Sequence, residues 1–252
     1  MIKRSFVIPV IDLSPHSPYN ILTLLEDLKG VDGEVICIFN SEEVYELLKS
    51  HNRIDKYCHN NMNAGVSRSW NLGINMAEAG VIFIMNADLH ISKKCIEEME
   101  QYLLSLDKAV IVGPQGSHLD LKRLAVTRYF QKGTFDKPVK THDVSGFLFA
   151  INGELYHQYR FCFDIRYSPC FFEEWDMGMQ VLLERQSLYA VPVIEFDHHW
   201  GMSQERDDRE IVYFGKTVKR GDVMIENRKK FVLKWCHQIP FHDDLLKEAG
   251  VR

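Results

Sequence analysis

Short apolar segments alternate with amphipathic ones along the first half of the chain. The apolar runs have the length of buried strands and lie at 5–11, 34–39, 55–58, 81–85 and 109–112. The segments between them carry apolar residues at helical spacing and lie at 18–28, 41–48, 65–77 and 92–106. Strands that alternate with helices in this way predict an α/β fold, in which helices flank a mostly parallel, Rossmann-like central sheet.

The regular alternation ends near residue 115. Residues 116–142 are polar and rich in lysine and arginine, and they are expected to form a long irregular loop. Farther along, the pattern predicts a strand at 144–151, a helix at 173–185 and a strand at 188–196 that Pro192 interrupts. The highly charged C-terminal part is expected to be helical through Trp235.

Composition narrows the class of protein. The chain has 252 residues, of which 46% are hydrophobic, so one sizeable core is expected. A net charge of −5 argues against a nucleic-acid-binding protein, whose surface would be basic. No run reaches the roughly 18 apolar residues of a membrane span, and the run 6–11 is too short for a signal peptide. Six scattered cysteines without a Cys-x-x-Cys pair indicate reduced thiols in a cytoplasmic protein.

A carboxylate stands just beyond the most apolar strand. Asn86-Ala87-Asp88 follows the run 81–85 directly. In an open α/β sheet, ligands bind at the carboxyl ends of the parallel strands. Asp88 is therefore expected to hold a divalent metal ion, and the metal to hold a diphosphate. The structural alternative is that Asp88 caps the helix that starts near Ser92.

A second candidate is the segment from Asn63 to Gly73. Asn63 and Gly65 predict a turn, and Ser67 falls in the first turn of the helix that follows. Small residues at a helix amino terminus let backbone N–H groups approach an anion. The alternative is a capped helix in which Gly73 serves only close packing.

Two further clusters lie in the second half. Glu173, Glu174 and Asp176 precede a strongly apolar helix, and clustered carboxylates raise one another's pKa, which suits a general base. An acidic helix start favoured by the helix dipole is the alternative. His198 and His199 follow a strand, and adjacent residues of a strand point to opposite sides. One of the two is therefore expected to bind metal; a structural role is the alternative.

These segments, in this order, resemble the inverting family 2 glycosyltransferases of the GT-A fold. The matching positions are Pro9 and Val10 at a strand end, Asn63, Gly65, Asn71 and Gly73, Asn86 and Asp88, Gly146 after Val144, the acidic cluster, and the late histidine with Gly201 and Ser203 behind it. The chain departs from the family pattern at three places. Asn86 replaces the first acid of Asp-x-Asp, as in rhamnosyltransferase-like members. Glu174 replaces the aspartate of Glu-Asp-x-Asp, and Asn40-Ser41 replace the acid that reads the nucleobase, which leaves the nucleotide open.

The resemblance implies metal-dependent, inverting transfer of a sugar from a nucleotide diphosphate sugar to a hydroxyl of a glycan or lipid-linked acceptor, in surface polysaccharide synthesis. Manganese or magnesium would be held by Asp88 and one histidine, with His198 preferred over His199. Glu174 would be the base, in a catalytic group with Glu173 and Asp176, and Asp176 would orient hydroxyls. The donor would be bound by Pro9, Asn40, Ser41, Asn63, Gly65, Ser67, Asn71, Asn86, Gly146 and Trp175, with Arg68 or a basic residue of 116–142 over the diphosphate.

The same resemblance suggests a division of the chain. Residues 1–215 would form the GT-A domain, with 1–115 binding the nucleotide sugar and 116–215 carrying the acceptor and catalytic groups. Residues 216–252 would be a helical tail. Its basic amphipathic part, 216–236, would either touch the inner face of the membrane or pack back on the domain.

Two other functions remain open from the residues. One is a sugar-phosphate nucleotidyltransferase, although such enzymes carry a Gly-rich basic loop after the first strand, where this chain has Asp12-Leu13-Ser14. The other is a non-catalytic relative that binds a nucleotide or glycan, which the departures at Asn86 and Glu174 would allow.

Overall fold

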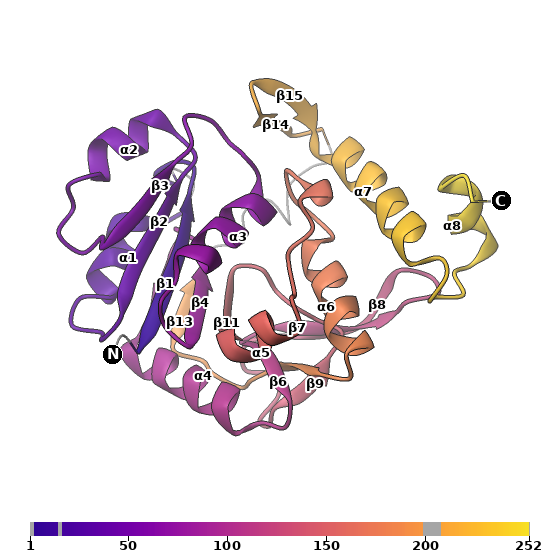
Figure 1. The fold of residues 1–252 in the computed structure, drawn as a ribbon, viewed down its shortest axis with the longest axis horizontal. Helices are drawn as coiled ribbons and strands as arrows, with labels where there is room; N and C mark the ends of the chain where they lie inside the picture. Colours follow the sequence, from indigo (N-terminus) through magenta and orange to yellow (C-terminus); the bar gives the residue numbers. More distant parts are fainter. Residues whose placement is uncertain (1–2, 15–16, 199–207, 252) are drawn as a thin grey trace.

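A computed structural model describes residues 3–14, 17–198 and 208–251. Its main feature is an eight-stranded sheet in the order β3-β2-β1-β4-β11-β6-β12-β9 (Figure 1). The strands are β1 (Arg4–Val10), β2 (Glu34–Phe39), β3 (Lys56–His59), β4 (Val81–Met85), β6 (Ala109–Gly113), β9 (Val139–Thr141), β11 (Leu148–Asn152) and β12 (Ser187–Ala190). Only β11 and β9 run antiparallel to their neighbours in this sheet. The predicted α/β fold with a mostly parallel sheet is confirmed.

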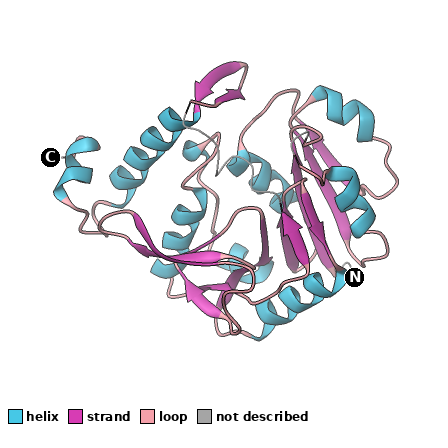
Figure 2. Cartoon of the chain, turned by 180° about the vertical axis from the view of Figure 1, so that it is seen from behind, coloured by secondary structure: helices cyan, strands magenta, loops and turns pink. Residues whose placement is uncertain are grey.

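Helices cover both faces of the sheet (Figures 1 and 2). The helices α1 (Ile21–Asp27), α2 (Glu42–Leu48) and α4 (Lys93–Ser105) pack on one face. On the other face lie α3 (Val66–Met76), α5 (Gly153–Gln158) and α6 (Glu173–Leu183). Successive side chains of a strand point to opposite faces, so in β1 Phe6 and Ile8 enter the first layer and Val7 the second.

Local sequence signals set most element boundaries in the first half. The strands predicted at 34–39 and 81–85 have those bounds. Ser92 caps α4 by accepting the backbone N–H of Cys95. The first helix starts at Ile21 rather than at 18, because the side chain of Asn20 accepts the N–H groups of Leu22 and Thr23 and so forms the cap. The six cysteines are free in the structure.

The prediction of an irregular loop at 116–142 is wrong. The segment forms β7 (Gly116–Asp120), β8 (Ala125–Phe130) and β9, and a three-stranded sheet joins β8 and β7 to β10 (Asp143–Val144). The β7–β8 ribbon extends toward the C-terminal helices (Figures 1 and 2). Most of β8 is exposed, so its sequence carries no continuous apolar run from which a strand is read.

Two predicted strands are each divided in two. The run 144–151 becomes β10 and β11, separated by the loop 145–147. The run 188–196 becomes β12 and β13 (Phe196–His198), and β13 pairs with β5 (Leu89–Ile91), a short strand that the sequence did not suggest. These breaks matter for function, because the loop 145–147 and the β5–β13 pair carry candidate site residues.

The C-terminal part packs onto the domain. It comprises a hairpin of β14 (Glu210–Tyr213) and β15 (Lys216–Lys219), then α7 (Arg220–Trp235) and α8 (Asp243–Glu248). Phe231, Val232 and Trp235 of α7 are buried with Tyr167 of the short helix η1 (Ile165–Tyr167) and Met179 of α6. The proposed division at 215/216 falls in the turn of the hairpin. None of the helices that the structure describes is long and apolar enough to cross a bilayer.

Replacing Gly73 by alanine tests the close packing of α3 on the sheet. A Cβ atom at Gly73 would lie 2.0 Å from Cγ1 of Val7, so β1 or α3 must shift. We expect Gly73→Ala to lower the free energy of unfolding by about 1–3 kcal/mol, the usual cost of overpacking, as measured by urea denaturation. Gly80→Ala is the control, because no atom lies within 4 Å of its Cβ position; an equal loss in both variants would contradict the packing role.

Candidate active site

The carboxyl end of β4 brings an acid and an imidazole together. Asp88 follows β4, and the pairing of β5 with β13 places His198 beside it. Oδ1 of Asp88 lies 3.3 Å from Nε2 of His198, and Nδ2 of Asn86 lies 3.4 Å from the same nitrogen. The His198 ring stacks on Phe147, with 4.4 Å between ring centroids. Asp88 and His198 are 110 positions apart in the sequence, yet they meet at the same edge of the sheet.

The chemistry of this pair fits a divalent cation. Two adjacent ligands of an octahedral ion, each about 2.1 Å from it, lie roughly 3 Å apart, which is close to the separation of Oδ1 and Nε2 here. A carboxylate oxygen with an imidazole nitrogen suits manganese well. Within the described part of the chain no three His, Cys, Asp or Glu side chains gather as a metal group. Diphosphate oxygens and water would have to supply the other ligands. His199 lies outside the described residues.

Glu174 stands at the start of α6 against a tightly fitted glycine. The backbone N–H of Gly146 donates to the Glu174 carboxylate. A Cβ atom at Gly146 would lie 2.3 Å from Oε1 of Glu174, so only glycine allows this approach. Burial, with a smaller contribution from the negative charge of Asp143, raises the pKa of Glu174 to about 7. A carboxylate with this pKa can accept a proton near neutral pH.

The loop 145–147 joins the two halves of the site. Gly146 contacts Glu174, and the next residue, Phe147, stacks on His198. The carbonyl of Phe147 also accepts the backbone N–H of Asn86, so the loop is tied to the end of β4. The structure thus brings Glu174, Asp88 and His198 around one short loop.

The two neighbouring acids face elsewhere. Glu173 is 3% exposed, and its Oε2 has no hydrogen-bond partner. Burial and the nearby Glu174 raise the pKa of Glu173 well above its ordinary value. Asp176 lies about 200° around the helix from Glu174. It is fully buried on the side of α7, and the structure does not bring it together with Glu174.

Asp176 is instead the centre of a buried polar cluster. Its carboxylate accepts hydrogen bonds from Tyr167, Gln180, Lys234 and Trp235, at 2.8–3.2 Å. Two of these donors belong to α7, so Asp176 attaches the C-terminal helix to the domain. Trp175 is also engaged: its indole donates to Asp143, and its ring packs against Phe172 and Phe231.

Several predicted donor-binding residues hold loops in place at the same sheet edge. Both ends of the Asn71 amide pair with the backbone of Phe163. The Asn40 side chain donates to Ile38 and Ser69, and its oxygen accepts from Asn60 and Ala64. Pro9 lies in β1 beside Ile38, and Ser41 occupies the N-cap position of α2 without capping it through its side chain.

The start of α3 is shaped by a turn and by the C-terminal hairpin. Oδ1 of Asn63 accepts the N–H of Gly65, which has φ +89°, while Nδ2 donates to Val212 of β14. The Ser67 hydroxyl is buried without a partner. Arg68 donates to Ser168 and Tyr213 and does not extend toward Asp88 in this arrangement.

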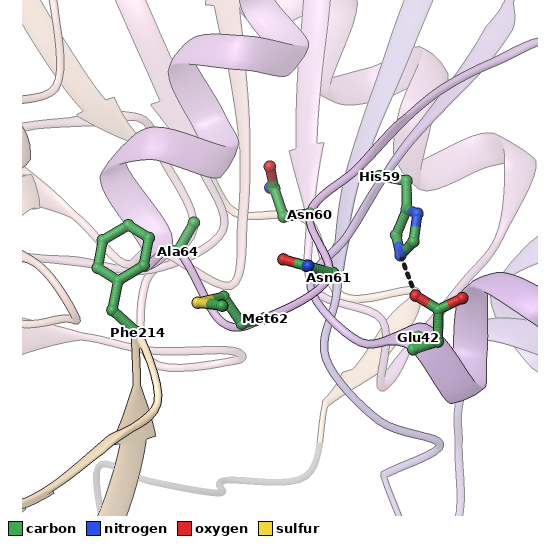
Figure 3. Close-up of a pocket in the computed structure, with 7 residues that line it drawn as sticks. All are labelled: Glu42, His59, Asn60, Asn61, Met62, Ala64 and Phe214. Atoms are coloured by element: carbon green, nitrogen blue, oxygen red, sulfur yellow. Dashed lines mark ion pairs between the residues drawn. The ribbon is translucent and has the colours of Figure 1, made fainter.

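A cavity of about 700 Å³ opens beside this turn (Figure 3). It is lined by Glu42, His59, Asn60, Asn61, Met62, Ala64 and Phe214. Phe214, from the turn of the hairpin, faces the 60–62 segment, and an ion pair between His59 and Glu42 lies at the other end. The sequence reasoning missed this cavity. Its only local signal was the amide pair Asn60-Asn61 directly after the third strand.

The fold is similar to that of glycosyltransferases of the GT-A type. The structure of GalNAc-T7 with UDP, GalNAc and Mn²⁺ superposes with a TM-score of 0.68 at 14% identity, over 94% of this chain and 48% of that one. The structure of S. aureus TarS gives 0.51 at 14% identity, over 76% of this chain and 37% of that one. The chain thus spans about half the length of the first of these structures and less of the second.

The sequence identifies the family. The model of Glycosyl transferase family 2 matches residues 6–160, which is more than half of the chain, so the chain belongs to this family. No curated protein matches the sequence. The expected resemblance to family 2 and to the GT-A fold is therefore confirmed, while the rhamnosyltransferase-like reading of Asn86 stays a prediction.

Replacing Asp176 by alanine tests its place in the buried cluster. Lys234, Tyr167 and Trp235 would each lose an acceptor, although Lys234 keeps Asp164 at 2.9 Å. We expect a loss of about 3 kcal/mol in the free energy of unfolding, at the lower end for a broken buried ion pair. Chemical denaturation measures it. A variant of normal stability that has lost donor affinity would instead place Asp176 in the binding site.

Proposed function

We propose that this chain is a metal-dependent, inverting glycosyltransferase. It transfers a sugar from a nucleoside diphosphate sugar to a hydroxyl of a glycan or lipid-linked acceptor. The observation that carries the proposal is the convergence of Asp88, His198 and Glu174 around the loop 145–147. Membership of Glycosyl transferase family 2 supports it.

The donor is proposed to lie across the carboxyl ends of four parallel strands. The cavity of Figure 3 adjoins the end of β3, and Asp88 follows β4, three strands away. At ~4.8 Å per strand this distance is about 14 Å, which an extended nucleoside diphosphate can span. The base would occupy the cavity, where the amides of Asn60 and Asn61 meet its polar edge and Phe214 meets its face.

The transfer step uses Glu174 as the base. Its carboxylate takes the proton of the acceptor hydroxyl while the oxygen attacks the anomeric carbon from the face opposite the diphosphate. The bond from the anomeric carbon to the diphosphate oxygen breaks, and a nucleoside diphosphate leaves with the bonding electrons. A single displacement inverts the configuration. A cation bound to Asp88 and His198 would neutralise charge on the leaving diphosphate.

The buried surroundings of Glu174 support this role. A glutamate of ordinary pKa would be ionised but weakly basic at neutral pH, whereas Glu174 is more basic and still half-buried rather than sealed. Glu173 is sealed from solvent, and its raised pKa disfavours a second negative charge that would repel the donor diphosphate. We assign the base to Glu174 alone and give Glu173 a structural place.

The proposed acceptor and cellular location rest on the family resemblance, because no contact in the structure identifies them. Synthesis of a surface polysaccharide at the cytoplasmic face of the membrane stays our proposal, as does the assignment of donor binding to 1–115 and of catalysis to 116–215. The packing of α7 through Phe231 and Trp235 favours the alternative in which 216–236 lies on the domain. Among the described residues, no contact favours a nucleotidyltransferase. Such an enzyme would release pyrophosphate instead of a nucleoside diphosphate.

Glu174→Gln tests the base. The amide keeps the shape of the side chain but cannot accept the proton, so we expect turnover to fall by roughly 10²–10⁴-fold while the nucleotide still binds. Release of nucleoside diphosphate from a panel of nucleotide sugars with Mn²⁺, and calorimetry with the free nucleotides, measure the two effects. In the unaltered enzyme, activity should fall as the pH drops below about 7, where Glu174 becomes protonated.

Glu184→Gln is the matched control for that variant, because Glu184 follows the same helix and is exposed. It should leave turnover unchanged. Normal turnover in Glu174→Gln would remove Glu174 from the mechanism.

Asp88→Asn tests the metal. The substitution removes the carboxylate charge and leaves His198 as the one proposed metal ligand. The Mn²⁺-dependent part of the affinity for a nucleoside diphosphate should therefore fall at least tenfold. Thermal-shift titration with UDP or GDP, with and without Mn²⁺, measures it. The exposed Asp107→Asn is the control. Equal Mn²⁺ dependence in both variants would contradict the assignment.

A further inference from the structure

A buried carboxylate stands behind the proposed base. Asp143, the first residue of β10, is 9% exposed and belongs to no motif that the sequence suggests. Its Oδ1 accepts the backbone N–H of Ser117 at 2.6 Å and the Ser117 hydroxyl at 2.7 Å. The indole of Trp175 donates to the same carboxylate. Burial raises the pKa of Asp143, and these three donors oppose that effect by stabilising its charged form.

The geometry connects Asp143 to Glu174 on two sides. Trp175, which donates to Asp143, is the residue after Glu174 in α6. Gly146, which donates to Glu174, lies three residues after Asp143. The helix cannot slide away from this strand easily, because a Cβ atom at Gly178 would lie 1.8 Å from the carbonyl oxygen of His142. The segment 142–146 therefore holds the start of α6 by its backbone and by one carboxylate.

Few other ionisable groups face this pair. Glu173 on the same helix is buried, and burial raises its pKa. The phenol of Tyr129 on β8 bonds to Gln115 and Ser145, and its pKa is raised to about 12, so it is neutral. Burial and the neighbouring His118 lower the pKa of His142. Burial likewise keeps the thiol of Cys170 protonated. The guanidinium of Arg220 lies over the Phe171 ring.

We propose that Asp143 is a positioning residue for the transfer reaction. It orients the start of α6 through the indole of Trp175, and its negative charge keeps the Glu174 carboxylate basic enough to take a proton from an acceptor hydroxyl. This inference rests on the proposed function, since it gives Glu174 the role of base. It assigns to Trp175 a hydrogen-bonded link to Asp143 in place of the predicted role in donor binding.

The test measures the titration of Glu174 without any sugar donor. In protein labelled with ¹³C at carboxyl carbons, the Glu174 signal is assigned by its disappearance in Glu174→Gln and followed from pH 5 to 9. We expect its midpoint near pH 7 in the unaltered chain. Asp143→Asn removes a like charge and should lower that midpoint by about one pH unit. The exposed Asp136→Asn should leave the midpoint unchanged.

Reciprocal coupling provides a second measurement that does not need the Asp143 variant to fold. If the two carboxylates interact, the Asp143 carbon must report the ionisation of Glu174 as a separate step near pH 7, and Glu174→Gln must remove that step. The carboxyl signal of Asp143 in the unaltered chain and in Glu174→Gln measures this. An unchanged Glu174 midpoint in Asp143→Asn, or the absence of that step, would overturn the electrostatic role.

Activity measurements separate the positioning role of Asp143 from the proposed glycosyltransferase function on which it rests. With a nucleotide sugar that the unaltered enzyme consumes, the acid limb of kcat/KM against pH should move with the Glu174 midpoint in Asp143→Asn. A structural defect alone would lower kcat/KM at every pH without moving that limb, and this result would contradict the proposal. Full activity of Glu174→Gln would defeat the proposed function, whereas the coupling of the two carboxylates would still be measured.

Discussion

The close approach of the Glu174 carboxylate to the backbone of Gly146 governs the arrangement of the site. It is possible only because residue 146 has no side chain, and it brings the start of α6 against the loop 145–147. The same loop accepts a hydrogen bond from the end of β4 and stacks on His198. A displacement of this loop would therefore separate the acid at 174 from the acid at 88. This contact therefore helps to set the position of the proposed base relative to the proposed metal ligands.

Three acids in four residues take different roles because their surroundings differ. Asp176 points toward α7 and meets four donors, so it stabilises the fold. Glu173 points into the protein without a partner for one oxygen, and burial raises its pKa. Glu174 is half-exposed and meets two backbone donors and a neighbouring carboxylate, and its pKa is raised to about 7. Environment rather than residue type separates catalytic from structural carboxylates.

The C-terminal part also contributes to the edge at which the donor is proposed to bind. Its hairpin bonds to Asn63 and places Phe214 at the cavity of Figure 3, while α7 is anchored by Asp176. The C-terminal part thus does more than pack against α6, because its hairpin also reaches the sheet edge beside Asn63. The C-terminal segment therefore contacts both the acidic start of α6 and the sheet edge at which the nucleotide is proposed to bind.

The sequence by itself determined the α/β fold, the strands at 34–39 and 81–85, and the family, because local periodicity and ordered motifs carry that information. It also marked Asp88, His198 and Glu174 as candidates. It did not show the strands within 116–142, whose exposed residues lack an apolar pattern, nor that Asp176 is buried away from Glu174. Only the tertiary structure decided those points, together with the cavity at 59–62 and Phe214 and the place of Asp143. Each depends on contacts between residues far apart in the chain, and such contacts leave no periodic signal in the sequence.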